Sequence, residues 1–364
     1  MKQQAKITVL VIAICFFGFS FLCWVKPMEE YSATERRKLE QFPELSLETV
    51  NDGSFMSDFE TYTMDQFPMR DGFRSLKAWI SQNVFFKKDN NEIYVADGYA
   101  AKMEYPLKEE SITNATKKFS EFYENYLKEK CEKIYVSVIP DKNYFLGEKH
   151  GYLTMDYERL FEMVKDEMSY AEYIDITDLL EIEDYYQTDI HWREEQIVDV
   201  AQRLGACMGV EAGKDYEQKT LENPFYGVYF GQSALNLPGE PLHYLTNPIL
   251  EQCVVYNYEN NQTLGIYDMK KAEGKDPYEI FLSGSVSLMK IENPNAASEK
   301  ELVVFRDSFG SSLIPLLAEG YRTITLVDIR YIQSAVVPKY VEFEGKDVLF
   351  LYSATVLNNS ETFK

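Results

Sequence analysis

The sequence predicts an α/β fold in which helices cover a mostly parallel sheet. Apolar, β-rich runs at residues 303–305, 324–327 and 348–352 have the character of buried strands, and amphipathic helices alternate with strands upstream of them. Such alternation is typical of parallel sheets, because a helix usually returns the chain between two parallel strands. The 364 residues suffice for one large domain or two modest ones.

Upstream elements follow from local patterns. Residues 92–95 and the Asp-Gly pair at 97–98 predict a strand and a turn. Apolar side chains repeat at three- and four-residue spacing over residues 119–127, as on one face of a helix. Residues 133–139 alternate as in a strand, which Pro140 ends. Further predictions are helices at residues 157–168, 194–204 and 312–318, a short strand at 173–176 and an inserted hairpin near 254–269.

The N-terminus has the pattern of a signal anchor. Residues 7–25 carry no charge and are long enough to cross a bilayer as a helix. Lys2 and Lys6 precede this stretch and acidic residues follow it, so the positive-inside rule predicts a cytoplasmic tail at 1–6 and an exported remainder. A cleaved signal peptide is the alternative. Residues 21–24 offer no cleavage site of the small-x-small type, which favours the anchor.

Between the anchor and the α/β domain, residues 26–88 predict a stalk with short helices. The apolar residues in 59–79 have mixed helical spacing, interrupted by Pro68 and Gly72. We expect the α/β domain to occupy residues 89–364.

Composition excludes several classes of function. The net charge of −22 argues against a nucleic-acid partner and disfavours docking of the folded part onto anionic lipid. Five cysteines are present, two of them in the anchor, and no C-x-x-C pair indicates a zinc or redox site. His150 and His243 have no acidic or cysteine partner at ligand spacing, so we predict no metal and no cofactor.

Ser308 stands in the stretch VVFRDSFG, residues 303–310, just past an apolar strand. A strand, a tight turn and a helix put its hydroxyl at the carboxyl end of the sheet, where open α/β folds place their sites. The helix that follows offers backbone N–H groups and its positive dipole end to an oxyanion. In the structural alternative, Asp307, Ser308 or Ser311 caps that helix.

The stretch TDIHW at residues 188–192 puts Asp189 two residues before His191. A serine hydroxyl needs a base to remove its proton, and the base needs a third group to fix its tautomer. A carboxylate and an imidazole at this spacing can meet in a loop but not on one face of a helix. Alternatively, Asp189 caps the helix predicted from residue 194, and His191 packs under Trp192.

Lys142 lies in the stretch PDKNY, residues 140–144, which follows a predicted strand. Loops at strand ends carry functional residues more often than average. Lys142 is therefore either a ligand for a carboxylate or a sugar, or a solvated surface residue.

These motifs resemble a known family. TDIHW is similar to the signature of the bacterial DHHW proteins and to the Asp-x-His-Trp motif of the alginate O-acetylation proteins, which have an SGNH-hydrolase-like domain. The resemblance spans roughly residues 30–355. Its supporting stretches are DQFPMR at 65–70, PDK at 140–142, YEIFLSG at 278–284, VVFRDSFG at 303–310 and VDIRY at 327–331.

The resemblance implies a Ser-His-Asp site, with Ser308 as nucleophile, His191 as base and Asp189 orienting the imidazole. Asp, His and Ser then come in a permuted order relative to ordinary SGNH hydrolases. It implies an extracytoplasmic O-acetyltransferase or acetylesterase of the cell envelope that acts on surface polysaccharide beside a membrane-bound O-acyltransferase. The alternative is a non-catalytic glycan-binding or scaffold protein of a polysaccharide export or modification complex.

The chain also departs from the family pattern. Arg306 stands where ordinary SGNH proteins have the glycine of Gly-Asp-Ser, and Ser285 stands where an asparagine is expected after Phe-Leu-x-Gly. Ile190 replaces the first histidine of the family signature. The candidate oxyanion or substrate contacts are Gly284, Ser285, Arg306, Lys142 and Arg330.

Overall fold

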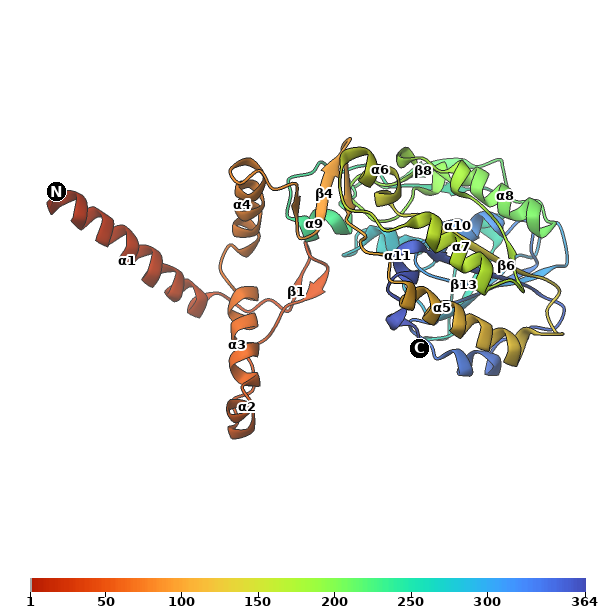
Figure 1. Ribbon diagram of the computed structural model, residues 1–364, viewed down its shortest axis with the longest axis horizontal. Coiled ribbons are helices and arrows are strands. Elements are labelled where there is room, and N and C mark those ends of the chain that lie inside the picture. The colour runs from red at the N-terminus through yellow and green to blue at the C-terminus, as the bar shows by residue number, and fades with distance from the viewer. Residues whose placement is uncertain (1) are drawn as a thin grey trace. The chain divides into compact units, whose positions relative to one another are not determined.

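The computed structural model describes residues 2–364, which form two compact units. The N-terminal unit contains the chain up to residue 91 together with residues 230–237, and the α/β unit contains residues 92–229 and 238–364. We predicted the start of the α/β domain at residue 89, and no sequence pattern marked 230–237 as part of the N-terminal unit. Figure 1 labels the elements of both units.

The N-terminal unit begins with helix α1 (Lys2–Val25). Its span Gln3–Val25, 23 residues, is long and apolar enough to cross a membrane. Among the described residues of this helix, no part of the apolar window is buried. The predicted N-terminal apolar helix is therefore present.

Two side chains at the end of helix α3, Asp65 and Gln66, hold the rest of this unit together. The elements are β1 (Tyr31–Ser32), β2 (Arg37–Lys38), α2 (Leu47–Asn51), α3 (Ser54–Asp65) and α4 (Arg70–Asn83). Gln66 accepts a hydrogen bond from the Glu29 backbone N–H at 3.0 Å and donates to the carbonyls of Glu29 and Glu40 at 2.8 and 3.0 Å. Arg37 donates to Asp65 at 2.7 Å and lowers the pKa of that carboxyl. Both contacts tie the β1–β2 hairpin to the end of α3.

The break between α3 and α4 falls at residues 66–69 and contains Pro68, as the sequence predicted. Gly72, the second predicted interruption, lies inside α4 instead. A single glycine costs a helix only about 1 kcal/mol relative to alanine, so it does not end one by itself.

The α/β unit is built on an eight-stranded sheet in the order β11-β10-β12-β14-β13-β15-β6-β7. The strands from β14 to β7 in that order pair in parallel, and β10, β11 and β12 add an antiparallel edge. The predicted fold class is confirmed. The strands are β6 (Ile134–Ile139), β7 (Glu172–Tyr173), β10 (Val254–Asn257), β11 (Gln262–Leu264), β12 (Leu288–Glu292), β13 (Glu301–Arg306), β14 (Thr323–Val327) and β15 (Asp347–Ser353).

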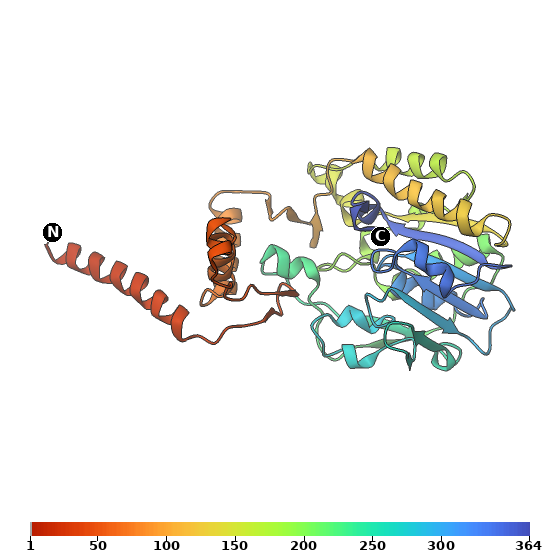
Figure 2. The same ribbon diagram turned by 90° about the horizontal axis from the view of Figure 1, so that it is seen from below.

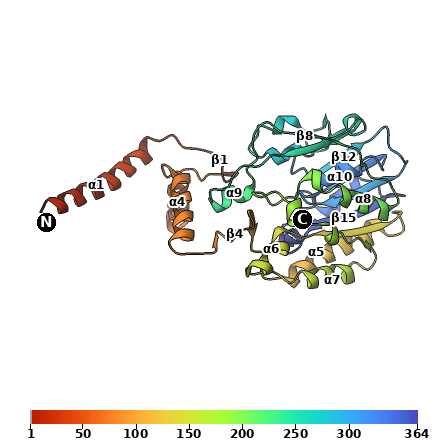
Figure 3. The ribbon, with the colours of Figure 1, turned by 90° about the horizontal axis from the view of Figure 1, so that it is seen from above.

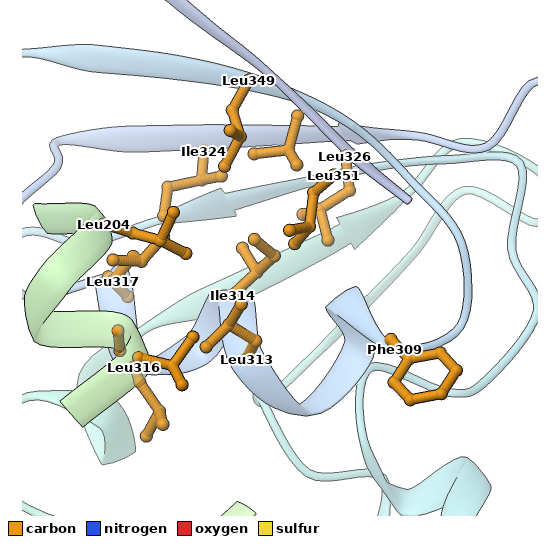
Figure 4. Close-up of a cluster of buried hydrophobic side chains, with 14 of the residues drawn as sticks. Leu204, Phe309, Leu313, Ile314, Leu316, Leu317, Ile324, Leu326, Leu349 and Leu351 are labelled. Atoms are coloured by element: carbon orange, nitrogen blue, oxygen red, sulfur yellow. The ribbon is translucent and has the colours of Figure 1, made fainter. Parts of the chain in front are cut away.

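Helices cover both faces of this sheet (Figures 1 and 3). Alternation along β13 points Leu302 and Val304 toward α8 and α10, and Val303 and Phe305 toward α5 and α7. Figure 4 shows the first of these two cores, in which Leu204 of α8 and Ile314 of α10 meet the strands. The helices are α5 (Glu109–Phe122), α7 (Tyr157–Glu167), α8 (Val198–Met208) and α10 (Gly310–Leu317).

The smaller elements differ in detail from the predictions. The hairpin at 254–264 extends the edge of the main sheet. Of the predicted strand at 173–176, only Tyr173 pairs with β6, together with Glu172 just before it. The chain ends beside α5, where Phe363 packs on Phe119 with ring centroids 5.6 Å apart (Figure 2). Other elements of the structure are β4 (Ile93–Ala96), β5 (Tyr99–Lys102), α6 (Lys142–His150), α9 (Val228–Ser233) and α11 (Ala354–Leu357).

Candidate active site

The candidate site lies at the carboxyl edge of the parallel strands. In a parallel sheet the carboxyl ends of neighbouring strands meet at one edge, so the loops that follow them converge. β13 leads into residues 307–309, β14 into 328–330 and β6 into 140–142, while β15 ends at Ser353. The motifs VVFRDSFG, VDIRY and PDK, which are separate in sequence, therefore share this edge.

Three of the predicted site residues form a continuous hydrogen-bonded chain. Asp189 Oδ1 lies 2.6 Å from His191 Nδ1, and His191 Nε2 lies 2.8 Å from Ser308 Oγ. Asp189 and His191 are buried, whereas Ser308 is partly exposed. These distances are within the range required between a nucleophile, its base and the group that orients the base.

The turn that carries Ser308 is held by the residue before it. Asp307 accepts from the Phe309 N–H at 3.0 Å, and its second oxygen accepts from the Ser353 N–H at 2.8 Å and hydroxyl at 2.7 Å. Asp307 therefore connects the ends of β13 and β15. Helix α10 begins with no side-chain hydrogen bond to its cap among the described residues, so the Ser308 hydroxyl faces His191 and is not a cap.

Asp189 is held in an extended loop by several donors. It accepts from the backbone N–H of His191 at 3.1 Å and of Val228 at 2.7 Å. The preceding Thr188 donates its N–H and its hydroxyl to Glu240 at 2.8 and 2.9 Å. Charge-assisted bonds of this kind hold a carboxylate in one orientation. The alternative in which Asp189 caps the following helix does not fit this arrangement.

A glycine makes room for this loop. A Cβ atom at Gly227 would lie 2.3 Å from Asp189 Cβ and 2.4 Å from Asp189 Cα, much closer than real contacts allow. The Gly227 N–H also donates to the Thr188 hydroxyl at 2.9 Å. Close backbone approach is a recognised use of glycine. Sequence analysis did not single out Gly227, because no local pattern links it to a residue 38 positions away.

Aromatic rings fix the plane of the imidazole. The Tyr278 ring stacks on His191 with centroids 3.9 Å apart and an interplanar angle of 7°. The Tyr278 hydroxyl lies 2.9 Å from Ser312 Oγ, which also accepts from Trp192 Nε1 at 3.0 Å. Trp192 Nε1 lies 3.1 Å from the carbonyl of Phe309 as well. The tryptophan of the TDIHW stretch thus connects the histidine loop to the start of α10.

Lys142 is buried, with 2% of its surface exposed, rather than solvated. Its ammonium donates to the carbonyls of Tyr186 at 2.8 Å and Gln187 at 3.3 Å, on the chain that leads into Asp189. Burial lowers the pKa of Lys142 to about 7. The neighbouring Asp141 begins α6 by accepting from the Asn143 N–H at 2.8 Å. This buried lysine therefore holds the backbone of the segment that leads into Asp189.

Lys142→Met is expected to flatten the pH dependence of the free energy of unfolding. Because the native pKa lies below the value of about 10.4 for an unfolded lysine, the unfolded chain binds more protons between about pH 7 and pH 10, and stability rises with pH there. Methionine does not titrate. Urea unfolding at about pH 7 and about pH 9 measures the rise. A rise equal to that of wild type would contradict a native pKa near neutrality, and the exposed Lys117→Met is the control.

Arg306 is completely buried and donates only to uncharged acceptors. Its guanidinium bonds to the Asp307 carbonyl at 3.2 Å, the Ser311 hydroxyl at 3.0 Å and the Gly284 carbonyl at 3.4 Å, and its Nε has no partner among the described residues. Burial lowers the pKa of Arg306. The side chain that replaces the expected glycine thus lies beneath the Ser308 turn and beside Gly284.

The loop at 282–285 has an uncommon backbone. Leu282, Ser283 and Gly284 have φ angles of 52°, 59° and 79°, three consecutive left-handed residues. Each non-glycine residue in this region costs roughly 1–2 kcal/mol, and such strain gathers at functional sites. Ser285 follows in an exposed position.

Arg330 is occupied by an ion pair. Its Nε and Nη2 atoms donate to the two oxygens of Asp328 at 2.9 and 2.6 Å. A bidentate pair of this type is geometrically specific and leaves the guanidinium little freedom. Within residues 2–364, no cluster of three or more His, Cys, Asp or Glu side chains has the arrangement of a metal site.

The fold has known counterparts. A DHHW family protein from Eubacterium siraeum is 20% identical with a TM-score of 0.62, and the match covers 75% of this chain and 95% of that one. Bacillus cereus PatB1 is 20% identical with a TM-score of 0.59, and the match covers 73% of this chain and 96% of that one. Its form with a sulfonyl adduct matches with a TM-score of 0.55, covering 73% of this chain and 97% of that one. These structural similarities show a shared fold and confirm the predicted resemblance.

A more distant match is the O-acetyltransferase domain of Pseudomonas putida AlgJ, 11% identical with a TM-score of 0.45, covering 73% of this chain and 92% of that one. This likeness is too weak to support an inference about function. No protein-family profile and no curated protein sequence matches the chain.

Proposed function

We propose that this chain is a membrane-anchored, extracytoplasmic serine O-acetyltransferase or acetylesterase that acts on cell-surface polysaccharide. The observation that carries the proposal is the chain of hydrogen bonds from Asp189 through His191 to Ser308. It places a partly exposed hydroxyl on a buried imidazole whose other nitrogen faces a buried carboxylate. That combination activates a serine for acyl transfer.

In the first half-reaction, Ser308 Oγ attacks the carbonyl carbon of an acetyl ester while His191 Nε2 takes the hydroxyl proton. The tetrahedral intermediate then collapses, the ester C–O bond breaks, and His191 returns the proton to the departing alcohol. Asp189 stabilises the imidazolium that exists between these two events. The products are the free alcohol and an acetyl ester on Ser308.

Backbone groups can stabilise the oxyanion of this intermediate. The Ser308 N–H donates no hydrogen bond to any acceptor within residues 2–364, so it is available to the oxygen of the attacked carbonyl. In the loop at 282–285, which Arg306 holds through the Gly284 carbonyl, the N–H groups of Leu282 and Gly284 donate to the carbonyls of Ile266 and Phe281. The second candidate donors are therefore the N–H groups of Ser283 and Ser285. One such donor is worth roughly 100- to 1000-fold in rate.

In the second half-reaction, a hydroxyl group attacks the acetyl-serine and gives its proton to His191, which passes it to the departing Ser308 oxygen. A sugar hydroxyl as the attacking group gives an O-acetylated glycan, and water gives acetate. The same three residues serve both outcomes, which differ in how well the bound acceptor excludes water.

Helix α1 supports the proposed location. A single apolar helix preceded by Lys2 and Lys6 fits an anchor that exports the α/β unit. Outside the membrane, polysaccharide is the acceptor that the motif similarity to the alginate O-acetylation proteins implies, and a membrane-bound O-acyltransferase is the implied source of acetyl groups.

A sulfonyl fluoride tests the nucleophile directly, because such reagents form covalent adducts with activated hydroxyls. PatB1, which shares the fold, is known with a sulfonyl adduct. The full-length chain in detergent is incubated with phenylmethylsulfonyl fluoride, and its intact mass is measured. One adduct is expected on wild type and on Ser57→Ala, an exposed serine control, and none on Ser308→Ala. Equal labelling of all three would contradict an activated Ser308.

Gly227→Ala is expected to lower kcat for an acetyl ester by about 100-fold, because the added methyl displaces Asp189 from His191. The matched control is Gly265→Ala, since a Cβ at Gly265 meets nothing within 4 Å. Circular dichroism separates this effect from unfolding. Wild-type kcat in a folded Gly227→Ala variant would show that the Asp189 position does not matter.

A further inference from the structure

Helix α4 exposes its apolar side. Phe73, Leu76 and Trp79 recur along this helix at three-residue spacing and are exposed, Trp79 to 57%. Directly after the helix, Phe85 and Phe86 are 68% and 82% exposed. Soluble proteins rarely leave such contiguous apolar surface uncovered unless it binds something. We call Phe73, Leu76, Trp79, Val84, Phe85 and Phe86 the α4 apolar surface.

The opposite side of α4 holds the helix in the N-terminal unit. Ala78 and Ser81 are buried. Arg70 and Arg74 both pair with Glu35, the latter at 3.2 Å. The helix is thus fixed mainly through its small and polar residues. Within the α4 apolar surface, Phe73 contacts the rings of Phe67 and of Phe19 in α1, with centroids 5.5 and 5.6 Å apart, while Leu76, Trp79, Phe85 and Phe86 stay exposed.

The charge of this segment is opposite to that of the chain. Residues 70–88 contain five lysines or arginines and one acid, Asp71, in a chain with a net charge of −22. Lys87 and Lys88 follow the two exposed phenylalanines directly and are themselves exposed. A face of Trp, Phe and Leu flanked by basic residues is the pattern of helices that lie in a membrane interface.

The tether to α1 keeps α4 near the bilayer. Only three residues lie between Val25, the end of the apolar span, and Glu29, so the two Cα atoms are at most about 14 Å apart. The Glu29 backbone both donates to and accepts from the Gln66 side chain, at 3.0 and 2.8 Å, and α4 starts four residues after Gln66. If α1 crosses the membrane, α4 cannot move far from its surface.

We propose that the α4 apolar surface docks onto the bilayer that α1 spans, with Trp79, Phe85 and Phe86 among the headgroups and Lys87 on anionic lipid phosphates. The total charge predicted no docking of the folded part onto anionic lipid, but the local charge of residues 70–88 has the opposite sign. Docking requires no catalysis and goes beyond the proposed function. It would hold the N-terminal unit flat on the membrane instead of leaving it on a free stalk.

Tryptophan fluorescence tests this in the full-length chain. Trp24→Phe removes the tryptophan within α1, and Trp192 is completely buried, so the difference between Trp24→Phe and the double substitution Trp24→Phe, Trp79→Phe reports Trp79 alone. Both proteins are placed in nanodiscs at one chain per disc, in phosphatidylcholine with and without phosphatidylglycerol, with lipids brominated near the headgroup. Docking predicts that bromine quenches Trp79 and that aqueous iodide does not.

The lysines provide the second measurement. Lys87→Glu should weaken docking on discs with phosphatidylglycerol by about fivefold or more, while the matched reversal Lys117→Glu on α5 should not change it. Quenching by iodide but not by bromine would overturn lipid docking. Protection of Trp79 from both quenchers that appears only with two chains per disc would also overturn it and assign the surface to a second copy. Neither outcome bears on Ser308.

Discussion

Ser308→Ala is expected to lower kcat/KM for an acetyl ester by roughly 10⁴- to 10⁶-fold, to the level supported by the oxyanion donors and binding alone. The physical reason is that alanine has no atom to form the acyl bond, and His191 then has no hydroxyl to deprotonate. Release of the phenol from p-nitrophenyl acetate measures the rate.

His191→Ala should lower kcat/KM about as much as Ser308→Ala does. The double substitution should lower kcat/KM no further than either single one, because the two residues act as a unit. Additive losses would mean that the residues act in separate ways. The control Ser57→Ala removes a serine hydroxyl in the same way, but Ser57 lies far in sequence from the site. This variant should retain wild-type activity.

Asp189→Asn is expected to lower kcat by about 10⁴-fold while the protein stays folded. The amide can present its NH₂ group to His191 Nδ1, which stabilises the tautomer that carries its proton on Nε2 and cannot accept one from Ser308. In the wild type the Val228 N–H donates to Asp189 Oδ2 at 2.7 Å and the His191 N–H donates to Oδ1 at 3.1 Å. The shorter bond favours an oxygen at the Oδ2 position and so directs the NH₂ toward the imidazole.

The matched control for Asp189→Asn is Asp178→Asn, an exposed carboxylate whose partner is Arg203. It should leave kcat unchanged. A loss below about tenfold in Asp189→Asn would show that the imidazole is oriented by its stack on Tyr278 and not by the carboxylate.

The fold could be predicted where local pattern and tertiary environment agree. The runs at 303–305, 324–327 and 348–352 are strands because they are buried on both faces, and residues 157–168 form a helix with one apolar face. Residues 230–237 belong to the N-terminal unit through contacts that no local period encodes.

The site could be predicted only in part. Asp189 and His191 are neighbours in sequence, and the motif around Ser308 marks a strand end. His191 and Ser308 are 117 positions apart, and the family resemblance was needed to predict that they meet. Gly227 and Tyr278 act through close approach and stacking, which leave no trace in local sequence. Lys142 has the sequence context of an exposed loop, and only the packing of the chain before Asp189 buries it.

The central claim is that Ser308 carries an acetyl group during the reaction, and one measurement tests it most directly. The full-length chain is mixed with p-nitrophenyl acetate, quenched in acid at short times and analysed by intact mass and peptide mapping. We predict a single acetyl group on the peptide that contains Ser308, absent from Ser308→Ala and formed much more slowly in His191→Ala. No adduct in wild type, together with equal phenol release by wild type and both variants, would contradict the account and favour a non-catalytic glycan-binding or scaffold protein.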